Sequence, residues 1–186
     1  MKRVFDIVIS SVLLMLLLPL LLLISLLVKL TSRGPIFYSS VRIGLNDKPF
    51  NMPKFRTMKL NTPELATHLL QNAENFLTRP GSALRRTSLD EIPQLFSILK
   101  GDMSLVGPRP ALYNQKDLIA LRRQKGVHKI KPGLTGLAQI NGRDDLSIAL
   151  KVKFDAEYVN KASIGLDIKI LISTFLKIFN KKDISH

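Results

Sequence analysis

An uncharged apolar stretch near the N-terminus constrains the fold of this chain more than any other feature. Residues 7–28, IVISSVLLMLLLPLLLLISLLV, contain no charged side chain over 22 positions, about the length that crosses the hydrocarbon core of a bilayer. The stretch is too long for a typical signal-peptide core, and no small-residue cleavage site precedes Lys29. The sequence therefore predicts a membrane helix, with a single span as the simplest topology.

Two details of this stretch argue against a simple span. Basic residues lie on both sides of it, at positions 2, 3, 29 and 33, so the positive-inside rule assigns no orientation. Pro19, in the middle of the stretch, removes one backbone hydrogen bond at the greatest depth in the hydrocarbon. A kink at Pro19 would let the helix enter the bilayer and return to the same face, but Pro19 is also compatible with a kinked span. The residues alone leave both topologies open.

The net charge is unusual for so apolar a chain. The 186 residues include 28 Lys and Arg against 14 Asp and Glu, a net charge of +14 at pH 7, although 46% of the residues are hydrophobic. A nucleic-acid-binding protein would explain the charge but not the apolar content, whereas a protein that lies on an anionic membrane and handles phosphates explains both. The absence of cysteine excludes disulfides and thiolate chemistry, and the three histidines lie far apart. A metal would have to be bound by oxygen ligands.

The rest of the chain predicts one α+β domain that is mainly helical. Residues 36–43 and 48–58 flank the turn GLND and indicate a small β-hairpin. Residues 131–143 form a glycine-rich loop, and residues 164–180 are apolar nearly all round, which favours packing in the core over packing on a membrane surface. The expected helices cover residues 63–77, 92–99, 112–125, 146–160 and 164–180.

Two adjacent carboxylates, Asp90 and Glu91, stand in the segment SLDEIPQLF. Ser88 and Glu91 have the spacing of a capping box, and acids in a first turn suit the helix dipole. Pro93 would then disrupt the second turn, so either the first turn is irregular or the helix begins nearer Pro93. The local sequence leaves a choice between an ordinary helix cap and a reactive pair.

Several cations next to glycine, proline or apolar residues are candidates for binding phosphate. The planar fork of arginine can bind two phosphate oxygens together, although each of these cations taken singly is compatible with a surface charge. The chain has neither a P-loop nor a dinucleotide-binding glycine motif, so arginines, loop N–H groups and a metal on the carboxylates would have to bind phosphate. The candidates are Lys54, Arg56, Arg85, Arg109 and Arg143.

Five motifs together resemble the bacterial sugar transferase family. They are, in this order, GPIF, GLND, KFRTM, LRRTSLDEIPQLFSILKGDMSLVGPRP and KPGLTGLAQINGR. The resemblance covers nearly the whole chain and is to the minimal, monotopic polyprenyl-phosphate phosphoglycosyl transferases. It implies transfer of a sugar phosphate from a UDP-sugar to polyprenyl (undecaprenyl) phosphate, with Mg²⁺, as the first membrane step in making a glycoconjugate such as O-antigen, capsule, exopolysaccharide or a glycoprotein glycan.

The resemblance also implies a topology. Residues 1–34 would form a re-entrant helix-break-helix, broken at Pro19, in one leaflet of the bacterial inner membrane. Residues 35–186 would form the catalytic domain on the cytoplasmic face. The family often has serine before this proline, whereas this chain has Leu18.

Roles of individual residues follow from the same resemblance. Asp90 would be the nucleophile, forming an aspartyl-phosphosugar intermediate and releasing UMP, and Glu91 would be its partner at the Mg²⁺ site. Asp167 and Arg56 would support the site. The positions implied to bind substrate phosphate are Lys54, Arg85, Arg109 and Arg143.

The expected partners are a UDP-sugar, polyprenyl phosphate and inner-membrane phospholipids, without nucleic acid, and a homo-oligomer is left open. The transferred sugar is not encoded in any motif, and we expect an N-acetylated amino sugar, with galactose or glucose phosphate as rivals. An alternative from another class is a bitopic membrane anchor with a basic module that binds lipid headgroups or nucleic acid. This alternative explains the apolar stretch and the net charge, but it gives the DE pair and the glycine-rich loop no role.

Overall fold

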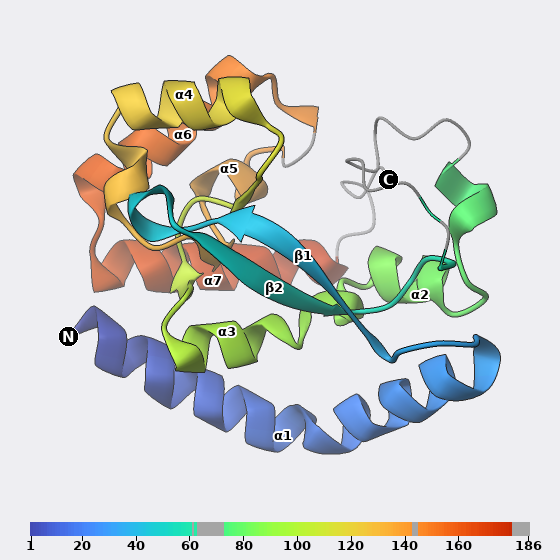
Figure 1. Cartoon of the computed structure of the whole chain (residues 1–186). Coiled ribbons are helices and arrows are strands. Elements are labelled where there is room, and N and C mark those ends of the chain that lie inside the picture. The colour runs from blue at the N-terminus through green and yellow to red at the C-terminus, as the bar shows by residue number, and fades with distance from the viewer. Residues whose placement is uncertain (61, 63–72, 143–144, 180–186) are drawn as a thin grey trace.

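One long helix forms a side of the molecule in the computed structural model, which describes residues 1–60, 62, 73–142 and 145–179. This helix, α1 (Lys2–Thr31), is long enough and apolar enough to cross a bilayer. It bends midway and curves around the rest of the domain (Figure 1). Pro19 lies inside it, so the expected helix-break-helix is here one continuous, bent helix.

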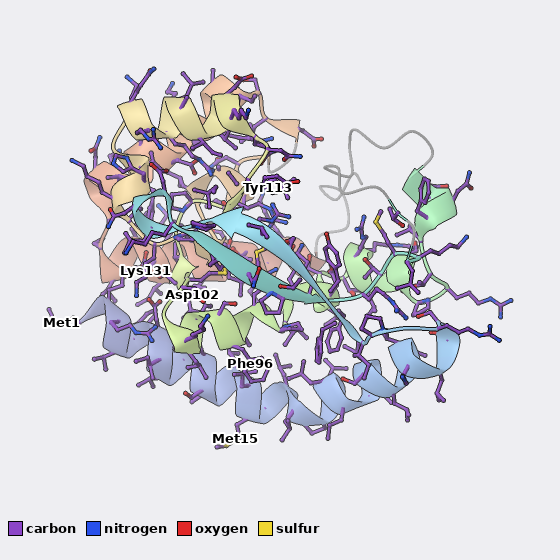
Figure 2. All side chains as sticks on the ribbon, viewed as in Figure 1. Met1, Met15, Phe96, Asp102, Tyr113 and Lys131 are labelled. Atoms are coloured by element: carbon purple, nitrogen blue, oxygen red, sulfur yellow. The ribbon has the colours of Figure 1, made fainter. Side chains whose placement is uncertain are left out.

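A narrow face of α1 packs against the domain. Leu21, Ile24 and Val28, spaced three and four residues apart, are buried and pack with Phe55 and Leu84. The packed face continues toward the N-terminus of α1, where Asp6 and Ser10 are also buried. The opposite side of the helix is apolar and exposed, and Figure 2 shows Met15 pointing away from the domain. An exposed apolar surface of this length indicates contact with a membrane. Its largest exposed side chains include Val4, Val8, Val12, Met15, Leu16, Leu22, Leu23, Leu26 and Leu30.

The predicted hairpin is confirmed. Strands β1 (Phe37–Ile43) and β2 (Pro49–Phe55) pair antiparallel, with the turn η1 (Leu45–Asp47) between them. A two-residue strand, β4 (Ala111–Leu112), extends the sheet on the other side of β1.

A second, parallel sheet was not predicted. It pairs β3 (Ser104–Val106) with β5 (Gly133–Thr135), the latter inside the segment expected to be a loop. The backbones of these two segments approach so closely that a Cβ atom on Gly133 would lie 2.1 Å from the backbone nitrogen of Gly107. Glycine is therefore needed in KPGLTG for packing of backbone against backbone.

The remaining helices largely follow the sequence prediction. The structure has α3 (Gln94–Lys100), α4 (Lys116–Gln124), α6 (Ile148–Lys161) and α7 (Ile164–Phe179) near the expected positions. It adds the short helices α2 (Gly81–Arg86) and α5 (Leu137–Ile140) and the 3-10 turns η3 (Ala73–Phe76) and η5 (Val127–Lys129). Most of the helix expected over 63–77 lies outside the described residues.

Helix α7 combines the two environments considered for it. Ile170 is fully buried in the main core, which also contains Ile98 of α3, Met52 of β2 and Tyr158 of α6. On its outer side α7 exposes Ile168, Ile172, Phe175 and Leu176. The prediction that this helix packs in the core is thus confirmed for one face of α7 and wrong for the other, which is exposed.

Candidate active site

The DE pair lies on a tight turn and not in a capped helix. Ser88 adopts a left-handed backbone conformation (φ 56°) and leads into the 3-10 turn η4 (Leu89–Glu91). Within the described residues its side chain makes no capping hydrogen bond, so the predicted capping box is wrong. Pro93 is the N-cap of α3, which confirms that the helix begins near this proline. The turn points both carboxylates inward, leaving Asp90 and Glu91 6% and 8% exposed.

Glu91 brings two of the predicted cations together. Its Oε1 accepts a hydrogen bond from Lys54 Nζ at 2.8 Å and another from Arg109 Nη2 at 2.8 Å. Arg109 Nη1 lies 3.4 Å from the other carboxylate oxygen. Lys54 comes from β2 and Arg109 from the GPRP loop after β3 (residues 107–110). Glu91 therefore connects three segments that are far apart in the sequence.

Asp90 differs from its neighbour because no described residue donates a hydrogen bond to its carboxylate. Burial raises the pKa of the Asp90 carboxyl, and the negative charge of Glu91 adds to this rise. The positive charges of Lys54, Arg85 and Arg109 act in the opposite direction. Asp90 is thus a buried carboxylate in a cationic environment, and its oxygens accept no hydrogen bond from the described residues.

Arg85 and Lys54 are, with Arg109, the positive charges that act on Asp90. Arg85 Nε donates to the hydroxyl of Thr57 at 2.9 Å, which ties the end of α2 to the chain just after β2. Burial lowers the pKa of the Lys54 ammonium, although the charge of Glu91 opposes this effect. Thr57 was missed in the sequence, where only its position beside Arg56 in KFRTM could have pointed to it.

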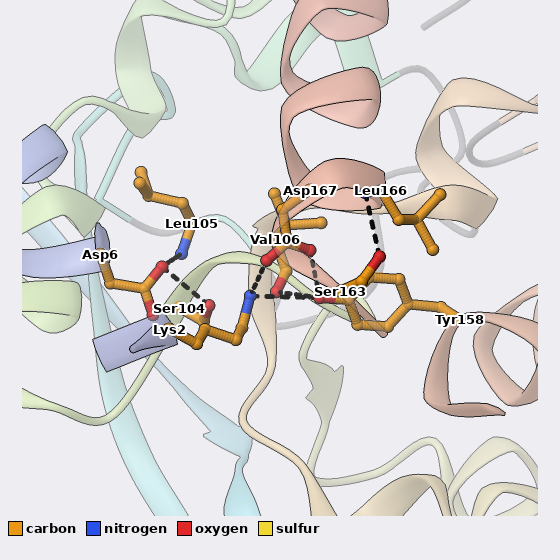
Figure 3. Close-up of polar contacts among 9 residues, drawn as sticks. All are labelled: Lys2, Asp6, Ser104, Leu105, Val106, Tyr158, Ser163, Leu166 and Asp167. Carbon is orange, nitrogen blue, oxygen red and sulfur yellow. Dashed lines mark hydrogen bonds and ion pairs between the residues drawn. The ribbon is translucent and has the colours of Figure 1, made fainter. Parts of the chain in front are cut away.

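The two residues predicted to support the site bind the ends of α1. Arg56 Nη2 donates to the carbonyl and the hydroxyl of Ser32, at 2.9 and 2.6 Å, just after the end of α1. Asp167 accepts hydrogen bonds from Lys2, at the start of α1, and from the Tyr158 hydroxyl (Figure 3). The described hydrogen bonds of both residues are with this scaffold and not with Asp90 or Glu91. Arg143 lies outside the described residues.

The carboxylate pair has the right donor atoms for Mg²⁺ but too few of them to bind it alone. The described residues contain no group of three or more His, Cys, Asp or Glu side chains that could hold a metal ion. Mg²⁺ is commonly bound through one or two carboxylates together with substrate phosphates and water. Asp90, whose oxygens accept no hydrogen bond from the described chain, and Glu91 fit this mode of binding.

Taken together, the fold and the site define a membrane-associated protein with a carboxylate site suited to phosphate chemistry. The chain belongs to the bacterial sugar transferase family, whose model matches residues 1–181. This confirms the resemblance seen in the motifs. Membership in a transferase family also argues against the alternative of a bitopic anchor with a basic binding module.

Individual relatives are similar over nearly all of this chain. The "UDP-glucose:undecaprenyl-phosphate glucose-1-phosphate transferase" of Escherichia coli K12 is 42% identical over 190 residues, which cover 98% of this chain and 41% of the relative. "Exopolysaccharide production protein ExoY" of Rhizobium meliloti is 42% identical, and the match covers 93% of this chain and 83% of the relative. "Uncharacterized sugar transferase EpsL" of Bacillus subtilis is 41% identical, and the match covers 100% of this chain and 91% of the relative. The chain thus spans about two fifths of the Escherichia coli relative but most of the other two.

Proposed function

We propose that this protein transfers a sugar phosphate from a UDP-sugar to polyprenyl phosphate at the cytoplasmic face of the bacterial inner membrane, as the first membrane step in building a glycoconjugate. One observation carries the proposal: Asp90 is buried, accepts no hydrogen bond from the described chain, and faces Lys54, Arg85 and Arg109. A carboxylate in its ionised form, which the facing cations favour, can act as a nucleophile without a general base. The names of the relatives supply the substrate class.

The reaction proceeds in two displacements at one phosphorus atom. An oxygen of Asp90 attacks the β-phosphorus of the UDP-sugar, the bond from this phosphorus to the bridging oxygen breaks, and UMP leaves with that oxygen. An oxygen of polyprenyl phosphate then attacks the same phosphorus, releasing the Asp90 carboxylate and forming the polyprenyl diphosphate sugar. A water-soluble donor and a lipid acceptor can thus use one site in turn.

The cations stabilise the negative charge that accumulates during both displacements. A diphosphate and a carboxylate repel each other, so their approach requires positive charge that is already in place. Arg109 and Lys54 are held by Glu91 at 2.8 Å, and Arg85 by Thr57. We assign these three residues, together with Arg143, to binding substrate phosphate. The ion pairs of Glu91 keep two of the cations next to Asp90 before substrate binds.

Mg²⁺ would be held by Asp90 and Glu91 together with the donor diphosphate. When bound, the ion supplies positive charge that polarises phosphoryl oxygens and neutralises the leaving phosphate. Glu91 contributes a second function in this arrangement, since its carboxylate also fixes Lys54 and Arg109.

The contacts of α1 support a re-entrant topology. At its N-terminal end Lys2 pairs with Asp167, and Asp6 accepts hydrogen bonds from Ser104 Oγ at 3.0 Å and from the backbone N–H of Leu105 at 3.1 Å (Figure 3). At the other end Arg56 binds Ser32. A straight span would separate one end from the domain by the hydrocarbon thickness, about 30 Å. Because both ends bind the same domain, we propose that both lie on the cytoplasmic side and that the bend of α1 lies deepest in the leaflet.

The function is tested by UMP release from the purified protein in nanodiscs that contain undecaprenyl phosphate and Mg²⁺. UDP-glucose is the first donor to test, because of the names of the relatives, followed by UDP-galactose and UDP-N-acetylglucosamine. We expect UMP release with one donor and none from Asp90→Asn, whereas the exposed Asp117→Asn should keep wild-type activity. Failure of every donor, or activity of Asp90→Asn equal to wild type, would refute the proposal.

A further inference from the structure

The GPRP loop is held by hydrogen bonds to its backbone from two distant arginines. Arg122 Nη1, from α4, donates to the carbonyl of Arg109 at 2.8 Å. Arg42 Nη1, from β1, donates to the carbonyl of Pro110 at 3.2 Å. Consecutive carbonyls of the loop that carries Arg109 are thus bound by side chains from outside the loop.

Arg122 is itself fixed by a buried carboxylate. Its Nε and Nη2 donate to Asp155 Oδ2 of α6, at 2.9 and 2.7 Å. The side chain of Arg122 is 11% exposed and that of Asp155 is 1% exposed. Two nitrogens of the guanidinium bind the carboxylate, which leaves the third directed at the Arg109 carbonyl, and this planar arrangement is specific to arginine.

A cleft lies along one side of the loop, next to Arg109. Pro108, Arg109 and Pro110 line the cleft together with Arg122 and with apolar residues such as Ile119 of α4. Pro108 and Pro110 are buried, whereas Arg109 is partly exposed, so packing holds the two prolines and the hydrogen bond from Arg122 holds the backbone of Arg109 between them. The backbone of Arg109 is limited by the prolines on either side, so a shift of its carbonyl would carry the whole residue with it.

We propose that Arg122, fixed by Asp155, is a positioning residue that places the guanidinium of Arg109 against Glu91 and the donor diphosphate. This inference rests on the proposed function of Arg109 in binding phosphate. A purely structural role, connecting α4 to α6, would need only the Arg122–Asp155 pair. The hydrogen bond to the Arg109 carbonyl is the contact that this simpler role does not require.

Arg122→Lys is the test variant, and Arg123→Lys is its matched control. Lysine can keep the ion pair with Asp155 but cannot bind the carboxylate and the carbonyl through one planar group. Arg123 is next in the chain and also pairs with a distant aspartate, Asp47, at 2.8 Å, but its side chain is 63% exposed. We expect Arg122→Lys to lower kcat/KM for the UDP-sugar by about tenfold or more, as for a misplaced catalytic group, with a higher KM. Arg123→Lys should stay within about twofold of wild type.

A double-mutant cycle separates positioning from simple stabilisation. If Arg122 acts through Arg109, then Arg109→Lys should be impaired, and adding Arg122→Lys to it should cause little further loss in kcat/KM. Multiplicative losses, or wild-type kinetics of Arg122→Lys, would overturn the inference. Wild-type kinetics of Arg109→Lys would instead refute the proposed role of Arg109. If Arg122→Lys does not fold, Asp155→Asn, which keeps an acceptor but loses the charge, is carried through the same cycle and judged by the same outcomes.

Discussion

Replacing the nucleophile by its amide should make the protein inactive and more stable. Asp90 is 6% exposed, and no described residue donates a hydrogen bond to its carboxylate. Burial, the largest effect, raises its pKa above the ordinary value of 3.8, and Glu91 adds to this, so the ionised form is disfavoured in the folded protein. Asp90→Asn removes this unfavourable charge while keeping the size of the side chain.

The size of the gain is limited by the neighbouring cations. Lys54, Arg85 and Arg109 stabilise the ionised carboxylate and offset part of its desolvation. We therefore expect a gain of about 1 kcal/mol in the free energy of unfolding, within the range of stabilising changes at functional sites. For a chain of this size, this corresponds to a rise in Tm of about 2–4 °C.

The pH dependence has a definite sign. Between pH 3.8 and the raised pKa, the folded wild type binds more protons at Asp90 than the unfolded chain does, so it loses stability as the pH rises through this window. The variant lacks this loss. Its advantage should be complete above the raised pKa and should vanish as the pH falls toward 3.8.

The assay is thermal unfolding of both proteins in the same nanodiscs, at pH 7.5 and at successively lower pH. Asp117→Asn, at an exposed position of α4, is the control and should change stability by no more than about 0.5 kcal/mol. A Tm of Asp90→Asn at or below that of wild type at pH 7.5, or a difference that does not depend on pH, would refute the reasoning about desolvation.

Three further substitutions test other parts of the account. Glu91→Gln should reduce activity by at least about a hundredfold and lower the free energy of unfolding by about 3 kcal/mol, because it leaves Lys54 and Arg109 without their carboxylate. The loss of activity is measured over a Mg²⁺ titration and the loss of stability as Tm. A variant with the wild-type rate and Mg²⁺ dependence would remove Glu91 from the site. Arg85→Lys should lower kcat/KM for the donor by about tenfold because the planar fork is lost, and steady-state kinetics that match wild type would make Arg85 an ordinary surface charge. Pro19→Ala should favour a straight helix that crosses the bilayer; a single cysteine at position 2 should then react with an impermeant thiol reagent in intact cells, whereas with Pro19 present it should react only after lysis.

The sequence predicted the elements whose signals are local. The hairpin was predicted from two short segments that flank the turn GLND. Helices α3, α6 and α7 were predicted from apolar residues at helical spacing. The parallel pairing of β3 with β5 was not, because each strand has three residues and the pairing joins segments that are distant in the chain. Helix α2 was missed because TRPG, residues 78–81, is typical of the end of a helix such as the one expected over 63–77. In the structure Pro80 is instead the N-cap of α2.

The candidate site was predicted through motifs, and its physical environment was not. A Ser-x-x-Glu spacing looks the same whether Glu91 caps a helix or binds Lys54 and Arg109, and only the tertiary structure decides between them. The buried pair of Arg122 and Asp155 had no sequence signal, since charges on polar helices usually face solvent. The contact of Asp167 with Lys2 was equally unpredictable, because the two residues are 165 positions apart in the sequence.

Detection of a covalent phosphosugar on Asp90 would test the central claim most directly. Wild type is mixed with the UDP-sugar and Mg²⁺ in nanodiscs without polyprenyl phosphate, quenched rapidly, and examined by intact-protein and peptide mass spectrometry. The account predicts release of up to one UMP per protein, a mass increase equal to one sugar phosphate located at Asp90, and loss of this mass when polyprenyl phosphate is added. UMP release that strictly requires polyprenyl phosphate, with no modified protein at any time, would contradict it.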